Sequence, residues 1–124
     1  MVNRIIKVLL ITTVLSIIGS MPVQAHHSTQ AFYTDEEIII DAEVVEWSYK
    51  NPHAVLVFKD KEGEHWVGEM GNIFSMSRQG VTPDSVPVGA QVEIKAKKAR
   101  EPVNRVHIEA IMRDGKAIYG TPDR

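Results

Sequence analysis

The chain of 124 residues contains no cysteine, which excludes a fold stabilised by disulfide bonds. It also lacks an excess of basic residues, because its formal net charge is −2. A nucleic-acid-binding domain usually carries a strongly basic face, so we expect no nucleic-acid partner. Motifs for common catalytic sites are missing too: there is no nucleophile elbow, no glycine-rich phosphate loop and no His-Glu-x-x-His sequence. We therefore expect a protein that is not an enzyme.

Residues 1–25 have the pattern of a secretory signal peptide. Arg4 and Lys7 precede an apolar stretch over residues 8–18, and Val23-Gln24-Ala25 places small residues where signal peptidase cleaves. A membrane anchor is the alternative, but the apolar stretch is shorter than the roughly 20 residues that span a bilayer. Cleavage after Ala25 leaves 99 residues with 12 basic and 16 acidic side chains. We expect a periplasmic protein with no stable membrane span after cleavage.

The mature chain reads as β-strands with one short helix. Strand-like segments occupy residues 38–47, 53–59, 64–70, 91–97 and 105–113, with a short edge strand near 117–119. Ile39 and Val45 interrupt the alternation of the first segment, which predicts a bulge. Asn72 is a suitable N-cap for a short helix that ends before Gly80. This order predicts an all-β fold, a five-stranded OB-like Greek-key barrel over residues 38–120 preceded by an arm over 26–37. An open sandwich is the alternative.

Several short motifs resemble a known family. They are His26-His27-Ser28, Glu46-Trp47, Asn51-Pro52-His53-Ala54, Trp66, Gly71-Asn72 with Arg78 and Gly80, and Asp84-Ser85 with Gly89. Together they resemble a group of small exported bacterial proteins, domain-of-unknown-function family 6152. Two loops depart from that pattern, at Thr29-Gln30-Ala31 and at Pro87-Val88-Gly89-Ala90. The resemblance implies export and this fold, and it implies no activity.

Histidines are the best candidates for a binding site. Cleavage after Ala25 would make His26 the first residue, so its free amine and its ring could chelate one metal ion. Such a nitrogen-rich set suits Cu(II), Ni(II) or Zn(II), and it resembles the histidine brace of some exported copper proteins. We expect a metal site, with Cu(II) as the leading metal, formed by His26, His27 and His53, because Pro52 presents His53 at a strand end. His65 and His107 are expected at outward-facing positions of their strands, either solvated or paired with a neighbouring strand, without a ligand role.

Each of these histidines also has a simpler interpretation. His26 and His27 can be the polar start of an arm, and the ring of His53 can cap the bend by bonding a backbone carbonyl.

Aromatic residues near the same bend suggest a second kind of site. Trp47 and Tyr49 flank the Asn-Pro sequence, and together with Asn51 they could line a groove for a partner protein, a glycan or another small ligand. Core packing is the expected role of Phe58 and Trp66. The sequence thus predicts a small exported binding module, with the metal site and the aromatic groove as its two alternatives.

Overall fold

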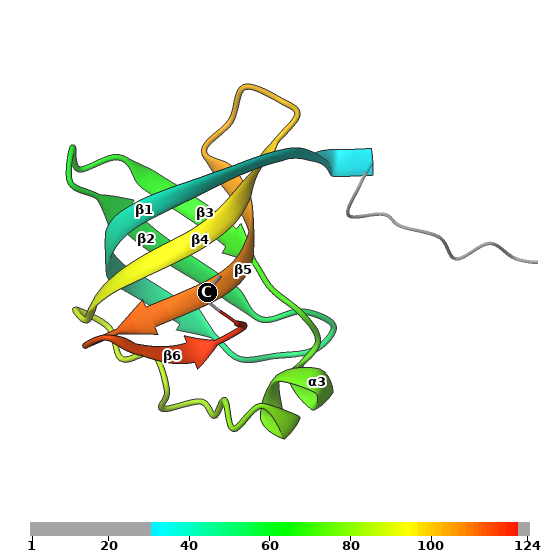
Figure 1. Cartoon of the computed structure of the whole chain (residues 1–124), viewed down its shortest axis with the longest axis vertical. Helices are drawn as coiled ribbons and strands as arrows, with labels where there is room; N and C mark the ends of the chain where they lie inside the picture. The colour runs from blue at the N-terminus through cyan, green and yellow to red at the C-terminus, as the bar shows by residue number, and fades with distance from the viewer. Residues whose placement is uncertain (1–30, 122–124) are drawn as a thin grey trace, which may run out of the picture.

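The computed structural model describes residues 31–121, which form six β-strands and one short helix (Figure 1). The elements are β1 (Tyr33–Ser48), β2 (Val55–Asp60), β3 (His65–Glu69), α3 (Ile73–Arg78), β4 (Gln91–Ala99), β5 (Arg105–Arg113) and β6 (Lys116–Tyr119). No helix of this part of the chain is both long and apolar enough to cross a membrane. The expected all-β fold with one short helix is confirmed.

The strands close into a ring. Their order is β3-β2-β1-β4-β5-β6, and an additional pairing joins β3 to β5. This closing pair is parallel, whereas the other five pairs are antiparallel. Five strands therefore surround one core, as the OB-like prediction required, and β6 is added beside β5. The helix α3 connects β3 to β4 and lies below the ring in Figure 1.

Strand β1 is long because it pairs with both of its neighbours. Its first part pairs with β4, from Tyr33 opposite Ala99 onwards, and its last part pairs with β2. The register with β2 shifts at Val45, where the sequence predicted a bulge. The strand begins at Tyr33, so residues 33–37 of the segment expected as an arm belong to the sheet.

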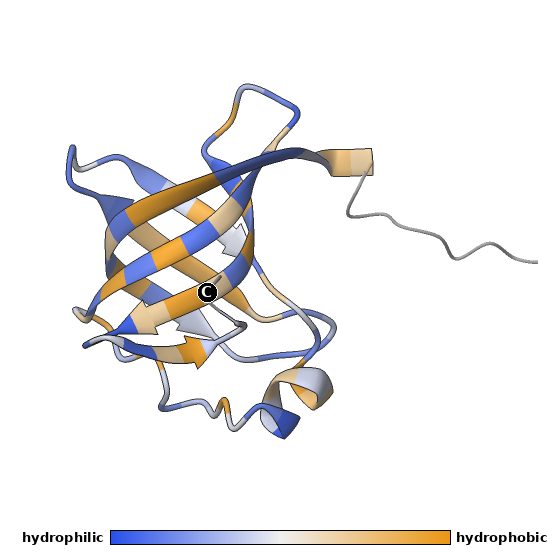
Figure 2. Cartoon of the chain, in the orientation of Figure 1, coloured by the Kyte–Doolittle hydropathy of each residue, from blue (hydrophilic) through white to orange (hydrophobic). Residues whose placement is uncertain are grey.

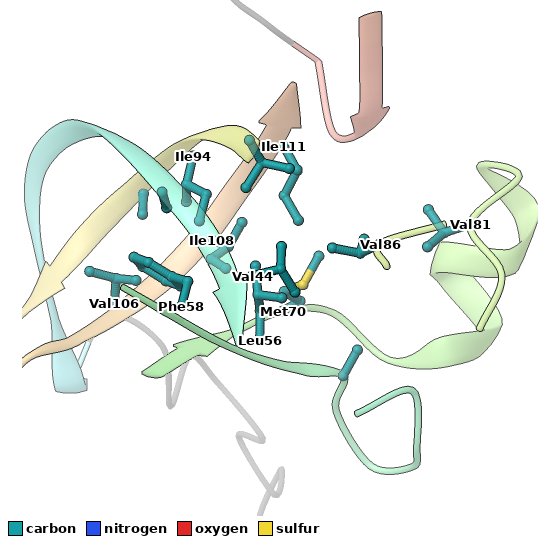
Figure 3. Packing of buried hydrophobic residues seen from close by; sticks show 14 of the residues in the cluster. Val44, Leu56, Phe58, Met70, Val81, Val86, Ile94, Val106, Ile108 and Ile111 are labelled. Atoms are coloured by element: carbon teal, nitrogen blue, oxygen red, sulfur yellow. The ribbon is translucent and has the colours of Figure 1, made fainter. Parts of the chain in front are cut away.

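Alternating side chains fill the ring. Figure 2 shows the corresponding bands of hydrophobic and hydrophilic residues along the strands, and Figure 3 shows the buried side chains meeting in the centre. The fully buried residues include Leu56, Phe58, Met70, Ile94, Val106, Ile108 and Ile111. Strict alternation from Val106 would turn Met112 inward, but the register between β4 and β5 shifts between Lys95 and Ala96, so that Ile111 faces the core instead. Trp66 is half-buried and stacks on Phe58, with ring centroids 6.4 Å apart.

The helix α3 has the predicted ends. The side-chain oxygen of Asn72 accepts a hydrogen bond from the Ser75 amide at 2.9 Å, which satisfies one of the free donors of the first turn. Gly80 follows the C-cap residue with φ +83°, a conformation that glycine adopts without steric cost. Met76 anchors the helix in the core.

Closure of the ring leaves no space for a side chain at Gly68. A Cβ atom placed there would clash with Cδ1 of Ile108, on the parallel neighbour β5, and would lie 2.7 Å from its Cγ1. The Ile108 side chain can therefore pack in this position because residue 68 lacks a side chain.

Gly68→Ala is expected to lower the free energy of unfolding by about 1–3 kcal/mol, the usual effect of overpacking a core. In an Ile108→Ala background the same substitution should cost clearly less, since the clashing atoms are gone. Denaturant unfolding of the four proteins of this double-mutant cycle measures the coupling. Equal costs in both backgrounds would contradict the close approach.

Candidate functional site

Of the three histidines in the predicted metal site, the structure describes His53. His26 and His27 lie outside the described residues. His53 is exposed, follows a cis Asn51–Pro52 peptide bond and precedes β2 by two residues. Its ring is therefore available on the surface at the end of β2.

The aromatic residues beside the bend have structural contacts. Trp47 and Tyr49 are half-buried against the core, with ring centroids 5.7 Å apart. The hydroxyl of Tyr49 lies 2.9 Å from the Val81 carbonyl and 3.2 Å from the Ile73 carbonyl, so it can donate to either. These contacts fasten the α3 segment to the ring. Asn51 is exposed nearby.

A group of polar side chains lies on the outer face of the ring, where β3 and β5 pair. Glu69 is directly opposite His107 in this pairing. The hydroxyl of Tyr33 donates a hydrogen bond of 2.9 Å to Oε2 of Glu69, and the Tyr33 ring lies 5.5 Å from the His107 ring at 45°. We call Tyr33, Glu69 and His107 the outer cluster. It joins the start of β1 to two strands that are distant in sequence.

Tyr33 is almost fully buried although it lies outside the ring, with 5% of its surface exposed. Burial raises the pKa of Tyr33 to about 12, and the hydrogen bond and charge of Glu69 contribute in the same direction. The neutral hydroxyl is therefore the form that the folded protein favours. By its hydrogen bond to Glu69, this hydroxyl holds the first residues of β1 on β3.

His107 is half-buried, pairs with Glu69 and packs against the Tyr33 ring, in line with the cross-strand role expected as one alternative for this outward-facing residue. Burial lowers the pKa of His107, while the carboxylates of Glu109 and Glu69 raise it and the charges of Lys97 and His53 lower it. Neutral imidazole is the form of histidine that binds metal ions.

A hollow of about 510 Å³ adjoins the outer cluster. It lies between the start of β1 and the β4–β5 connection, which are neighbours in Figure 1 and are joined by a 2.9 Å hydrogen bond from the Arg100 amide to the Phe32 carbonyl. Its walls include Glu69 and Arg105 and the exposed apolar side chains of Phe32 and Val103. The site thus combines a polar cluster with an amphipathic hollow.

The outer cluster does not form a complete metal centre by itself. Within residues 31–121, no three or more His, Asp, Glu or Cys side chains are close enough to one another to hold a metal ion. Any metal bound here needs donors from the rest of the chain or from solvent.

Two members of the outer cluster, Tyr33 and Glu69, were not predicted as site residues from the sequence. Tyr33 lies in the segment expected as an arm, where Phe32-Tyr33 is an aromatic pair in a polar stretch. Glu69 lies in a predicted strand segment. Neither residue belongs to a sequence motif that indicates which residue it contacts.

The fold and the cluster define a small all-β domain, a ring of five strands with polar groups on its outer face. Residues 14–107 match the model of a family of unknown function, DUF6152, so the chain belongs to that family. This confirms the resemblance found in the sequence motifs. A comparison with curated proteins found no match, and a comparison with solved structures found none either.

The buried Tyr33 hydroxyl predicts that one tyrosine ionises at a higher pH than an ordinary tyrosine. In an ultraviolet titration of the folded protein, a tyrosine should ionise near pH 12, and Tyr33→Phe should remove that step. Because the folded pKa lies above the unfolded value of about 10, this stabilisation is complete below pH 10 and is lost as pH rises toward 12. The stability of Tyr33→Phe should therefore decline less over that range. A wild type without a step near pH 12 would contradict the burial of this hydroxyl.

Proposed function

We propose that the protein is an exported, periplasmic binding domain that takes up a divalent transition-metal ion, with Cu(II) as the leading metal. The ligands in this proposal are His26, His27 and His53. The free amine of His26 would supply a further nitrogen after removal of residues 1–25. Amine and imidazole nitrogens are the donors that Cu(II) prefers.

The observation that carries the proposal is the hydrogen bond from Tyr33 to Glu69. It fixes the start of β1 on β3. Glu69 pairs with Val55 of β2, which is two residues from His53. The chain therefore enters the described domain on the part of the surface where His53 is exposed.

The connecting segment is long enough for this site. Tyr33 is seven residues further along the chain than His26, and an extended chain covers at most about 3.3 Å per residue, or about 23 Å in total. The strand spacing of about 4.8 Å makes the step from β3 to the end of β2 short by comparison. A segment of this length can bring the His26 amine back to His53 without disturbing the sheet.

The first test concerns the amino terminus. The intact mass of the protein purified from the periplasm is expected to equal that of residues 26–124, because the chelate needs His26 as the first residue. Retention of residues 1–25, or cleavage one position to either side, would remove the amine from the site.

The second test concerns affinity for copper. We expect His53→Ala to weaken Cu(II) binding at least about tenfold, and one extra residue before His26 to weaken it further, in a competition titration with a chromogenic chelator. Binding should also weaken as pH falls through about 6–7, because protons compete for these nitrogens.

His65→Ala is the matched control. His65 is exposed and pairs with Lys59, four residues along the β2–β3 hairpin from the pair formed by Val55 and Glu69. Its removal should leave the affinity unchanged. Equal copper affinity of the wild type, His53→Ala and the extended chain would refute the metal site.

The alternative function is a module that binds a partner protein or a glycan. The hollow beside the outer cluster favours it, since exposed Phe32 and Val103 lie there next to Arg105. Aromatic and arginine side chains are common anchors in binding interfaces. This function becomes the leading one if the copper titrations fail.

A further inference from the structure

We propose that a hollow at the end of the ring of strands away from α3 binds one sugar unit of a glycan. The indole of Trp66 is the surface on which the sugar stacks, and Lys98 donates a hydrogen bond to it. None of the walls of this hollow belongs to the outer cluster. The site is independent of the metal site proposed above, and it gives Trp66 a role beyond the core packing expected from the sequence.

The hollow lies where β1 separates from β2. Strand β1 pairs with β2 only from Ala42 onwards, and residues 37–41 pair with β4 alone. A hollow of about 360 Å³ opens there, between β1, the β2–β3 turn and the last part of β4. Figure 1 shows the β2–β3 and β4–β5 connections at the end of the ring opposite α3. The volume is in the range of small-ligand sites.

Trp66 presents a flat apolar surface to this hollow. Its indole stacks on the fully buried Phe58, with ring planes only 4° apart. Because Phe58 lies in the core, the other face of the indole is directed away from the core, where Trp66 forms a wall of the hollow. Its Nε1 donates a hydrogen bond of 2.9 Å to Oδ2 of Asp60. The indole is therefore held in one orientation before any ligand binds.

Two isoleucines of β1 extend this apolar surface. Ile38 is opposite the buried Ala96, and Ile40 is opposite the buried Ile94. Side chains directly opposite each other in an antiparallel pair point to the same face of the sheet, so both isoleucines are on the inner face. They are only half-buried, because this end of the ring is open beside them.

Lys98 brings an unpaired ammonium group to the same hollow. It is opposite the fully buried Val106, so it lies on the inner face of β4 at the end of the strand. Its neighbour Lys97 lies on the outer face, where its ammonium is paired with Glu109 at 3.0 Å. Within residues 31–121 the ammonium of Lys98 forms no hydrogen bond or ion pair. It is therefore available to a ligand.

The other polar groups of the hollow do not select an ion. Lys61 is paired with Asp41, and both carboxylate oxygens of Asp60 accept N–H groups. Glu62 remains as an acceptor and Lys98 as a donor. The three carboxylates outnumber the two ammonium groups by one, so an anion gains no net attraction. A neutral ligand with several hydroxyl groups fits this mixture better.

A pyranose sugar combines the features that this site requires. One face of its ring exposes mainly C–H groups, which leave water when they stack on the indole. Its edge carries hydroxyl groups that can accept from Lys98 and donate to Glu62. The ligand class that the geometry supports is therefore a neutral hexopyranose unit.

The test follows the two indole N–H signals of the purified protein by NMR. Oligomers of glucose, galactose, mannose and N-acetylglucosamine are added up to their solubility limits. At least one of them should shift the Trp66 signal saturably. Trp47, which packs on Tyr49 at the α3 end of the ring, is the internal control and should not respond. A Trp66 signal that none of the four moves, or equal shifts of both signals, would overturn the proposal.

Variants test the roles of the two side chains with the sugar that binds. Trp66→Leu is expected to weaken binding at least about tenfold, because it removes the aromatic anchor. Lys98→Met, which keeps the apolar stem, should weaken it about twofold to tenfold, the usual loss for one hydrogen bond. Lys97→Met is the matched control on the outer face and should bind as the wild type does.

Unchanged affinity in Trp66→Leu would show that the indole is not the platform and would overturn the proposal. If Trp66→Leu does not fold, unchanged affinity in Lys98→Met would do the same. None of these residues is a ligand in the proposed metal site, so copper binding and sugar binding succeed or fail separately.

Discussion

The parallel pairing of β3 with β5 is the constraint on which the rest of this structure depends. It converts a row of antiparallel strands into a ring, and it is possible because Gly68 leaves room for Ile108 of the facing strand. A chain of this size buries only a modest core, and no disulfide adds to it. Closing the ring pairs the open edge of β3 with β5 and encloses the core to which the fully buried Phe58 and Ile94 belong. Stability thus depends on a contact between segments almost 40 residues apart.

The same closure creates the polar site. Glu69 and His107 become neighbours only when β3 and β5 pair, and the Tyr33 hydroxyl can reach Glu69 because β1 extends along β4 as far as Ala99. The same strand pairings therefore position both the core residues inside the ring and the outer cluster on its surface. Alternation along β5 makes this explicit: Val106 and Ile108 face the core, while His107 between them faces outward. A change that weakens closure would disturb both the packing inside and the polar groups outside.

Local patterns in the sequence were sufficient to predict most strand segments and which of their side chains face the core. Alternation in residues 91–97 and 105–110 identified the inward residues of β4 and β5, and the bulge at Val45 and the N-cap Asn72 were visible as local signals. Contacts between distant segments were not visible in this way. The sequence around Glu69 does not indicate that His107 is its neighbour. The two residues become adjacent through the parallel pairing of β3 and β5, which are separated in the sequence by α3 and β4. Met112 departs from the simple alternation for a related reason, since the register of β5 against β4 shifts between Ile108 and Ala110.

This arrangement links any ligand of the outer face to folding. His53 precedes β2 and His107 lies in β5, on the two sides of β3, so the distance between them is defined only in the folded ring. A ligand that contacts both side chains therefore binds the native state and not the unfolded chain, and it must stabilise the fold in proportion to RT ln(1 + [L]/Kd). At a concentration one hundred times its Kd, such a ligand adds about 2.7 kcal/mol. For a small domain without disulfides this is a large fraction of the total stability. Binding on the outer face would then tighten the closure that creates the site.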